Sequence, residues 1–281
     1  MHIYNLMITG IPRAGTTLTA ALVDSLENAV CLSEPQWEVS WNQEAPNHTA
    51  YVQGLIDNFH AVRGRLLKGE EILDRRDADG AAITNYFRQK KNGSTEILYK
   101  MMPVRRPALP SDFLLSMKHN AHYTCVLPDL LGAPGLSVLA IIRHPIPTIL
   151  SWRSHTIPIQ QGRLPAGEKY WPELCALIER TQDILQIQVG IYGLFCERFR
   201  IHHPSFKLIR YEDLVQHPAL VSDYLQRRQI KSVPVQNQNQ TQNHNRIQNN
   251  IDTIADIIRI KEYLRLYCPA AYEFYPDIDQ W

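Results

Sequence analysis

The chain has 281 residues, of which 44% are hydrophobic, and its 29 basic and 28 acidic side chains leave a formal net charge of +1. This length is enough to bury one substantial core, and we treat residues 1–281 as a single domain. The near-neutral balance gives no sign of a nucleic-acid-binding or a polybasic membrane-binding protein. Any anion site must therefore depend on a few locally placed cations.

The five cysteines are dispersed and form no CxxC pair. An odd number of scattered cysteines is typical of reduced, mostly buried thiols. The first apolar run begins within a few residues of Met1, which leaves no room for a signal peptide, and no later run is long enough to span a bilayer. We therefore expect a soluble, cytoplasmic protein, and the sequence leaves its oligomeric state open.

The first motif is a loop framed by two glycines. An apolar run over residues 3–8 predicts a buried strand, Gly10 and Gly15 bracket the loop, and Thr16 begins a helical pattern. Such a loop directs backbone N–H groups and a helix N-terminus at an anion. The Gly-x4-Gly spacing fits a Walker A loop, but Thr16 stands where a nucleotide triphosphatase needs Lys, and the cation lies instead at Arg13. The loop is predicted to bind a phosphate group, but not ATP with magnesium.

The rest of the chain alternates between strand and helix patterns, which predicts a parallel α/β sheet flanked by helices. Strands are predicted over residues 29–32, 97–101, 136–142 and 206–210, and helices over residues 16–26, 145–152, 171–199, 211–215, 219–227 and 251–267. Residues 45–95 are predicted to form a helical cap. Residues 113–127 fit either a hairpin or a helix and a strand. The Gln/Asn-rich residues 236–250 are predicted to be a flexible segment.

A helix with an unusual surface is predicted after the second strand. Residues 33–36 read Ser-Glu-Pro-Gln, which fits a capping box with Pro in the first turn. The helix would place Glu34, Trp37, Glu38 and Trp41 on one face. Indoles and carboxylates together suit a cation, a guanidinium group or an amine. The alternative is that the tryptophans belong to the core and the acids to a solvated face.

Four separated pieces of the chain resemble motifs of sulfotransferases that use 3′-phosphoadenosine 5′-phosphosulfate (PAPS). Residues 10–18 resemble the family's 5′-phosphosulfate loop. Residues 142–145, Ile-Arg-His-Pro, together with Ser151 resemble its 3′-phosphate site. Residues 208–214 resemble its late Tyr-Glu-Asp-Leu motif, whose Tyr contacts the nucleotide, and Lys100 resembles a strand-end Lys that reaches the transferring sulfonate.

The resemblance implies a P-loop-like α/β fold with a helical acceptor-side cap, and an enzyme that moves a sulfonate group from PAPS without a metal ion. The donor-binding residues would be Arg13, Ala14, Gly15, Thr16, Thr17, Leu18, Arg143, Ser151 and Tyr211. The two ends of PAPS are separate anions, so each needs a fixed cation and hydroxyl or amide donors. Arg13 and Lys100 would neutralise charge on the leaving phosphate.

The resemblance also implies a general base that deprotonates the acceptor. One branch of the family uses a His two residues after the strand-end Lys, and here that position is Met102. A second branch, which includes tyrosylprotein sulfotransferases, uses a Glu just beyond the second strand, and Glu34 stands at the matching place. We predict Glu34 as the base, with His119 and His122 as alternatives. In a first helical turn, the helix dipole would lower the pKa of Glu34 and weaken it as a base.

For the acceptor, we hypothesise a small molecule with a hydroxyl or an amine, for example a cationic natural product such as a guanidinium alkaloid. Glu34, Trp37, Glu38 and Trp41 would bind it. Two other functions compete with this hypothesis. A P-loop small-molecule kinase would need a magnesium site and a P-loop Lys. A non-catalytic nucleotide-binding protein would have kept the loop and lost the base.

Overall fold

The computed structural model describes the chain except for residues 1–2, 90–94, 107 and 236–250, so the predicted Gln/Asn-rich segment lies outside the described residues. The predicted parallel sheet is confirmed: five parallel strands lie in the order β2-β7-β1-β8-β9. These strands are β1 (Asn5–Gly10), β2 (Ala29–Ser33), β7 (Leu114–Lys118), β8 (Leu136–Ile142) and β9 (Lys207–Arg210).

The central strand β1 is buried along its whole length. Its neighbours β7 and β8 lie in register with it, so that Asn5 is opposite both Leu115 and Leu136. A parallel sheet covered on both faces needs apolar side chains at successive positions, which is why β1 and β8 are nearly continuous apolar runs. The predicted strand over residues 136–142 is confirmed, and the one predicted over residues 3–8 lies two residues later.

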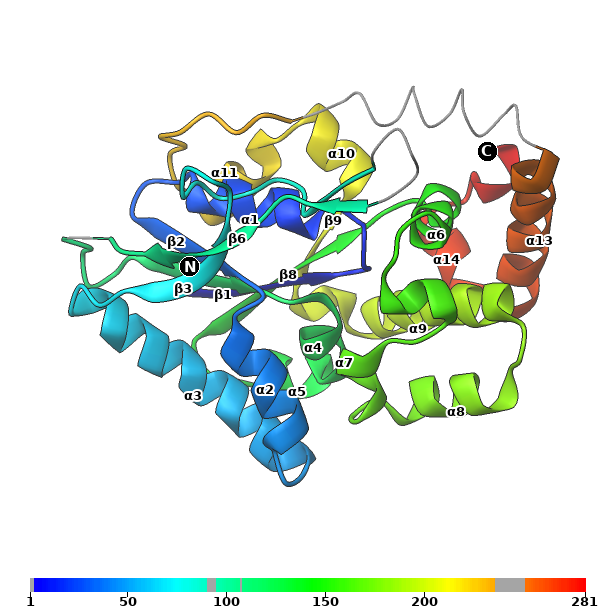
Figure 1. The fold of residues 1–281 in the computed structure, drawn as a ribbon, viewed down its shortest axis with the longest axis horizontal. Coiled ribbons are helices and arrows are strands. Elements are labelled where there is room, and N and C mark those ends of the chain that lie inside the picture. The colour runs from blue at the N-terminus through cyan, green and yellow to red at the C-terminus, as the bar shows by residue number, and fades with distance from the viewer. Residues whose placement is uncertain (1–2, 90–94, 107, 236–250) are drawn as a thin grey trace.

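Helices cover both faces of the sheet (Figure 1). One side carries α1 (Thr16–Asp24), α10 (Tyr211–Gln216) and α11 (Ala219–Leu225), and the other carries α3 (His48–Leu67), α4 (Asn120–Cys125), α5 (Leu127–Leu131) and α9 (Ile184–His202). The remaining helices are α2 (Gln36–Glu44), α6 (Pro145–Arg153), α7 (Pro165–Glu168), α8 (Pro172–Arg180), α13 (Ile251–Tyr267) and α14 (Ala270–Phe274). Along the described stretches of the chain, none of the helices has both the length and the apolar content needed to cross a bilayer.

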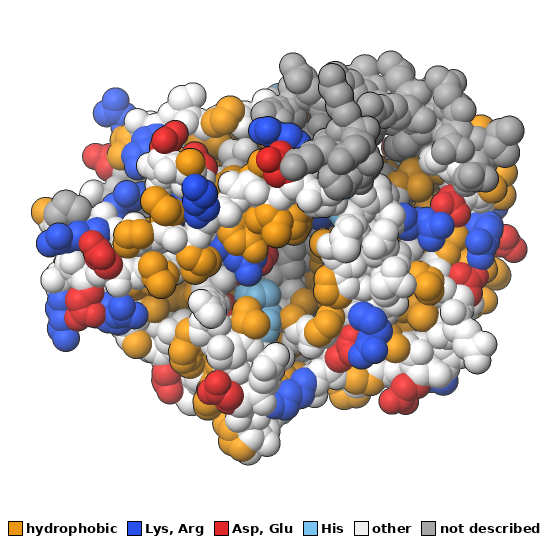
Figure 2. Space-filling model, viewed as in Figure 1, with side chains coloured by type: hydrophobic (Ala, Val, Ile, Leu, Met, Phe, Trp, Pro, Cys, Tyr) orange, Lys and Arg blue, Asp and Glu red, His pale blue; other side chains and the backbone are white. Residues whose placement is uncertain are grey.

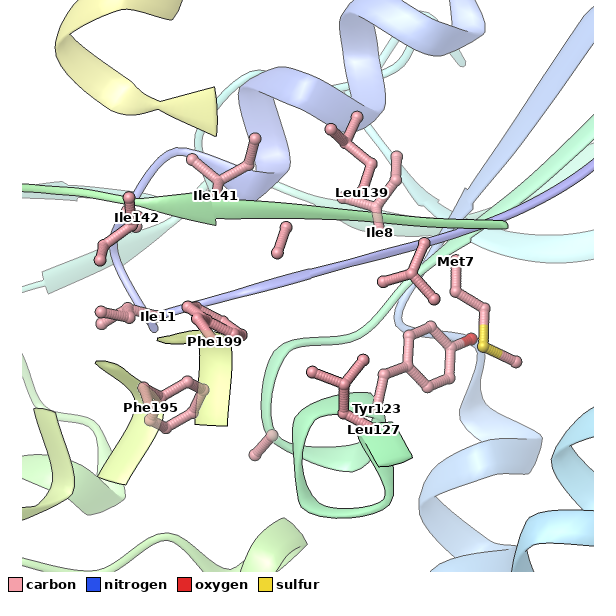
Figure 3. Packing of buried hydrophobic residues seen from close by; sticks show 14 of the residues in the cluster. Met7, Ile8, Ile11, Tyr123, Leu127, Leu139, Ile141, Ile142, Phe195 and Phe199 are labelled. Carbon is pink, nitrogen blue, oxygen red and sulfur yellow. The ribbon is translucent and has the colours of Figure 1, made fainter. Parts of the chain in front are cut away.

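The core lies between the sheet and these helices. In Figure 3, Tyr123 and Leu127 lie beneath β1, while Phe195 and Phe199 of α9 approach Ile11 from the same side. All five side chains are fully buried. The strand ends that carry the loops are therefore held by a rigid core on this face. The five cysteines are free, as expected, and four of them are buried.

The predicted helical cap over residues 45–95 is helical only as far as α3. The chain then forms β3 (Ile72–Arg76), which pairs antiparallel with β6 (Lys100–Val104), and β4 (Phe87–Gln89), which pairs with β5 (Thr95–Ile97). Burial alternates along β3: Ile72 and Asp74 are buried, whereas Leu73 between them is 58% exposed. This period of two belongs to a strand. Pro103 lies within β6 and does not end it.

The predicted capping box is also wrong. Ser33 is the last residue of β2, and α2 begins at Gln36 with no side chain capping it. The Ser33 hydroxyl accepts a hydrogen bond from the Tyr86 hydroxyl at 2.7 Å, and its N–H donates to Asp74 Oδ1 at 2.6 Å. Ser33 cannot cap the helix, because Pro35 occupies the N-cap position and Ser33 still belongs to the strand. Glu34 lies before the helix, with a left-handed backbone (φ 56°).

The structure also decides two predictions about helices and strands, those for residues 171–199 and for residues 113–127. The single helix predicted over residues 171–199 is two helices, α8 and α9, because Asp183 caps α9 by accepting the Leu185 N–H at 2.9 Å. Residues 113–127, which fitted two interpretations, form a strand followed by a helix. That strand, β7, lies between β1 and β2 in the sheet.

Candidate functional site

Charged and polar side chains gather at the carboxyl ends of the parallel strands. Glu34 follows β2, Lys118 ends β7, the loop over residues 10–16 follows β1, Arg143 follows β8 and Tyr211 follows β9. The chain passes from β1 through α1 to β2 on one side, while β8 lies on the other side of β1. Such a switch point at the carboxyl edge is where open α/β sheets bind ligands.

The loop after β1 needs glycine at both ends. Gly10 has φ 152°, and a Cβ there would lie 2.4 Å from the Ile141 carbonyl oxygen. Gly15 has φ 95°, and its Cβ would lie 2.4 Å from the ring of Tyr211. Helix α1 begins at Thr16 with no side chain capping its N-terminus, so its first N–H groups are available to an anion.

The other predicted loop residues have different surroundings. Ala14 is buried, and its N–H donates to the Ile11 carbonyl at 3.0 Å, so this amide is already used within the loop. Thr16 is buried and Thr17 is partly exposed, while the Leu18 side chain packs into the core. The anion-facing donors of the loop are therefore backbone groups at the start of α1 rather than the amide of Ala14.

Arg13 supplies the charge of the loop. Its guanidinium donates to Ser151 Oγ through Nε at 3.4 Å and to Asn85 Oδ1 through Nη1 at 3.2 Å, and it lies over the ring of Phe87. Burial, followed by the nearby charge of Arg143, lowers the pKa of Arg13 to about 10. The side chain is thus held in place and is still protonated at neutral pH.

Arg143 lies against the same loop. Its Nη1 donates to the Arg13 carbonyl at 3.2 Å, and its guanidinium lies 4.7 Å from the centre of the Tyr211 ring. Its Nε is buried and has no hydrogen-bond partner within the residues that the structure describes. Neither arginine forms an ion pair with a carboxylate of the described chain. Two neighbouring cations in this state call for an anionic ligand, because an unpaired buried charge is costly.

Glu34 is held by two cations. Its N–H donates to the Lys118 carbonyl at 2.8 Å, Lys118 Nζ donates to Oε1 at 2.5 Å, and Arg75 Nη1 donates to Oε2. Burial raises the pKa of Glu34, but Lys118 and Arg75 outweigh burial and hold that pKa below its ordinary value. Glu34 is therefore ionised at neutral pH, and ion pairs rather than a helix dipole are the reason.

Lys118 was missed by the sequence analysis. Its side chain is 1% exposed, and Nζ lies 4.6 Å from the centre of the Tyr86 ring. The signal was a Lys directly after the apolar run over residues 113–117, but that run was not recognised as a strand of the central sheet. Lys100, predicted for the same role, instead begins the peripheral strand β6 and is exposed. The structure places Lys118, and not Lys100, against Glu34.

The two alternative bases, His119 and His122, are buried beside Glu34. Their rings lie 3.9 Å apart, and His122 Nδ1 shares a hydrogen bond with the Tyr51 hydroxyl at 2.6 Å. His119 Nδ1 has no partner among the described residues. Burial lowers the pKa of His122 to about 4 and that of His119 well below its ordinary value, so both rings are neutral at pH 7. Figure 2 shows histidine within the hollow in the middle of this face.

The predicted cation-binding face of α2 is not assembled. Trp37 is 43% exposed and stacks on Trp41, with ring centres 5.7 Å apart, whereas Glu38 points inward and is fully buried. Glu38 Oε1 accepts the Tyr123 hydroxyl at 2.6 Å, and burial raises its pKa to about 8. Positions 37 and 41 are one turn apart, which lets their indoles stack, and Trp41 Nε1 donates to the Tyr51 carbonyl at 3.3 Å. Glu38 is thus neutral at pH 7 and is buried, whereas the Trp37 indole is turned toward solvent.

Comparisons with known proteins add distant structural likenesses only. No family model matches the chain. No curated protein matches it either. A sulfotransferase domain from the curacin biosynthetic pathway is 15% identical over 83% of this chain and 76% of its own, with a TM-score of 0.39. A sulfotransferase from Alicyclobacillus acidocaldarius is 11% identical over 94% of this chain and 97% of its own, with a TM-score of 0.41.

Proposed function

We propose that this chain is a sulfotransferase that moves a sulfonate group from PAPS to a hydroxyl or amine of a small-molecule acceptor. The observation that carries the proposal is the contact between Arg13 and Arg143, which no carboxylate neutralises within the described residues. A donor with a phosphosulfate at one end and a separate phosphate at the other would supply the two anions that this pair lacks.

The residues present fit such a donor. Arg13 and the N–H groups at Thr16 and Thr17 would hold the 5′-phosphosulfate. Arg143, with its unpartnered Nε, would hold the 3′-phosphate together with Ser151. When bound, PAPS supplies a sulfonate that is activated by its link to a good leaving phosphate.

The acceptor side lies at the neighbouring strand ends. Lys118 ends β7, which pairs directly with β1, and it is opposite Ile8 in the register. Its charge would offset the negative charge that develops on the leaving phosphate, the task first predicted for Lys100. Glu34 is ionised and would take the acceptor's proton. Its two cations weaken it as a base, so the neutral rings of His119 and His122 stay the alternatives.

The two competing functions make different demands. A kinase on this fold uses a Lys after the second loop glycine to hold phosphates, and the residue here is Thr16. A non-catalytic nucleotide-binding protein would have no use for the ionised Glu34 with Lys118 at the strand ends next to the loop. Nucleotide binding distinguishes the kinase from the sulfotransferase, and turnover distinguishes the non-catalytic protein from it.

The test of the donor site is isothermal titration with 3′,5′-ADP, 5′-AMP and ATP with magnesium. We expect 3′,5′-ADP to bind most tightly. Arg143→Gln should weaken 3′,5′-ADP by more than about tenfold and leave 5′-AMP nearly unchanged, because only the first ligand carries the 3′-phosphate. Arg180→Gln, an exposed charge at the end of α8, is the matched control and should change neither.

Two outcomes would contradict the proposal. Tighter binding of ATP with magnesium than of 3′,5′-ADP would favour the kinase. Normal 3′,5′-ADP binding without transfer of labelled sulfonate from PAPS to any member of a panel of phenols, amines and sugars would favour the non-catalytic protein.

A further inference from the structure

The charges around Glu34 do not suit a cationic acceptor. Glu34 contacts two cations, Lys118 and Arg75, while the neighbouring Glu38 and His119 are buried without a formal charge at neutral pH. The acceptor side thus has one more positive charge than negative. An acceptor that places its hydroxyl against Glu34 lies beside Arg75, which contacts the same carboxylate and is partly exposed.

Arg75 is the cation of this group that reaches solvent. Its side chain is 21% exposed, compared with 1% for Lys118. Its guanidinium lies 5.3 Å from the centre of the Tyr86 ring and 4.8 Å from the centre of the Tyr99 ring. A guanidinium has five N–H donors in a planar fork, and the contact with Glu34 uses Nη1. The aromatic rings therefore hold a fork that can bind a second anionic group.

The position of Arg75 is fixed by the residue after it. Arg76 is 1% exposed and forms ion pairs with Asp24 on α1 and with Asp74, both at 2.7 Å. These contacts fasten β3 to the central part of the fold. Because successive strand residues point to opposite sides, the anchoring of Arg76 on one side presents Arg75 on the other. Arg75 is thus pre-organised at the acceptor side.

We propose that the acceptor is a hydroxyl compound that also carries a carboxylate, and that Arg75, with Tyr86 and Tyr99 beside it, binds this carboxylate. The inference rests on the proposed sulfotransferase function and names its substrate class. Arg binds carboxylates through paired N–H groups, and an ammonium group in the same place would meet two cations and one anion. It replaces the guanidinium alkaloid considered from the sequence.

Three phenols of similar size and phenol acidity provide the test: 3-(4-hydroxyphenyl)propionate, 2-(4-hydroxyphenyl)ethanol and tyramine, which are anionic, neutral and cationic. Each is titrated into the enzyme saturated with 3′,5′-ADP, so that binding is measured apart from turnover. The acid should bind at least about tenfold more tightly than the amine, with the alcohol between them. Arg75→Gln should weaken the acid about tenfold and the alcohol less than about threefold.

Lys100→Gln is the matched control, because it removes one positive charge from an exposed site on the paired strand β6. It should leave the ratio of acid to alcohol unchanged. Arg75→Lys keeps the charge, loses the planar fork and should give an intermediate ratio, which a variant that merely unfolds would not. Equal affinity for the three phenols, tighter binding of tyramine, or no binding of the acid would overturn the inference. Failure to bind 3′,5′-ADP would count against the proposed function itself.

Discussion

The charge of Glu34 is set by its neighbours rather than by its place in the chain. In a first helical turn, a Glu loses basicity to the helix dipole. Here the residue precedes the helix, and Lys118 and Arg75 bond to its two oxygens. Both the helix dipole and the two ion pairs would lower the pKa of Glu34, but in this structure the ion pairs are the cause. Removing either Lys118 or Arg75 would raise the pKa of the Glu34 carboxylate.

Replacing either member of the Glu34–Lys118 pair should stop turnover while sparing the donor site. Glu34→Gln removes the proposed base, and Lys118→Met removes the charge beside the leaving phosphate, so each should lower kcat by about a hundredfold or more. The affinity for 3′,5′-ADP should change little in Glu34→Gln, since Arg13 and Arg143 are untouched. Labelled-sulfonate transfer and isothermal titration measure the two effects.

Two control variants distinguish this assignment from its alternatives. Lys100→Met should keep the wild-type kcat, because the side chain is exposed on β6. His119→Asn should also stay close to wild type if Glu34 is the base. A collapse of kcat in His119→Asn, with Glu34→Gln still active, would transfer the role to the histidine.

The wild-type rate should not fall between pH 7 and pH 5 through protonation of Glu34, because its pKa is lowered and the basic form persists.

The glycine loop is an element whose local sequence carries its structure. The Gly-x4-Gly spacing predicted a phosphate loop, and the structure shows why neither glycine can be replaced at no cost. Gly15 combines a positive φ of 95° with a ring placed where its Cβ would be. The ring belongs to Tyr211, which follows the edge strand β9, two strands away from β1. Gly15 is therefore required both by the local turn and by the contact with Tyr211 from a distant part of the chain.

Gly15→Ala should impair the donor site more than it impairs folding. A residue with a side chain at this φ costs about 1–3 kcal/mol of stability, and the added Cβ must also displace Tyr211. Gly135→Ala is a matched control, because it has a similar positive φ of 74° and no atom within 4 Å of the place that its Cβ would take. Both variants should lower the unfolding free energy, but only Gly15→Ala should weaken 3′,5′-ADP, by about tenfold or more. Equal weakening in both would contradict the role of the contact.

The elements that could be predicted from sequence are those whose signal is local. The apolar run over residues 136–142 and the Pro145 helix start were located correctly, as was the amphipathic pattern of α13 over residues 251–267. The peripheral strands β3 to β5 fall within residues predicted to be helical or just beyond them. These short segments contain few apolar residues, and they form strands because they pair with neighbouring segments. Asp183 could have been recognised as a helix cap, and it was not.

The order of the strands across the whole sheet decides which residues form one site. Arg13, Arg143, Ser151 and Tyr211 could be grouped from their motifs, because each lies in a short pattern with its own meaning. Lys118 and Arg75 lie in no such pattern. They reach Glu34 because β7 is inserted between β1 and β2, and because β3 returns to the end of β2. The contacts of Lys118 and Arg75 with Glu34 depend on how distant segments pack. The pattern of apolar residues along any one segment therefore cannot predict them.

The attachment of the peripheral sheet to the rest of the molecule depends on Arg76. Arg76→Met would leave Asp24 and Asp74 buried without their main cation, at 4% and 1% side-chain exposure. Breaking a buried pair in this way costs about 3–5 kcal/mol, which urea unfolding at pH 7 would measure. Arg65→Met, which breaks the exposed pair with Glu70, should cost about 1 kcal/mol or less.

The pH dependence of the same variant separates lost charge from lost packing. Without Arg76, the pKa of Asp74 should rise further, since burial already raises it to about 6 with the arginine present. The pKa of Asp24 should rise from its lowered value, although Arg106 still pairs with this carboxylate at 3.0 Å. A carboxyl with a raised folded pKa costs stability as the pH rises through that pKa, and the cost disappears when the group is protonated. The difference in unfolding free energy between wild type and Arg76→Met should therefore shrink between pH 7 and pH 5. A difference that stays constant over this range would mean that Arg76 acts through packing alone, and β3 would then be held to the central sheet by its apolar contacts.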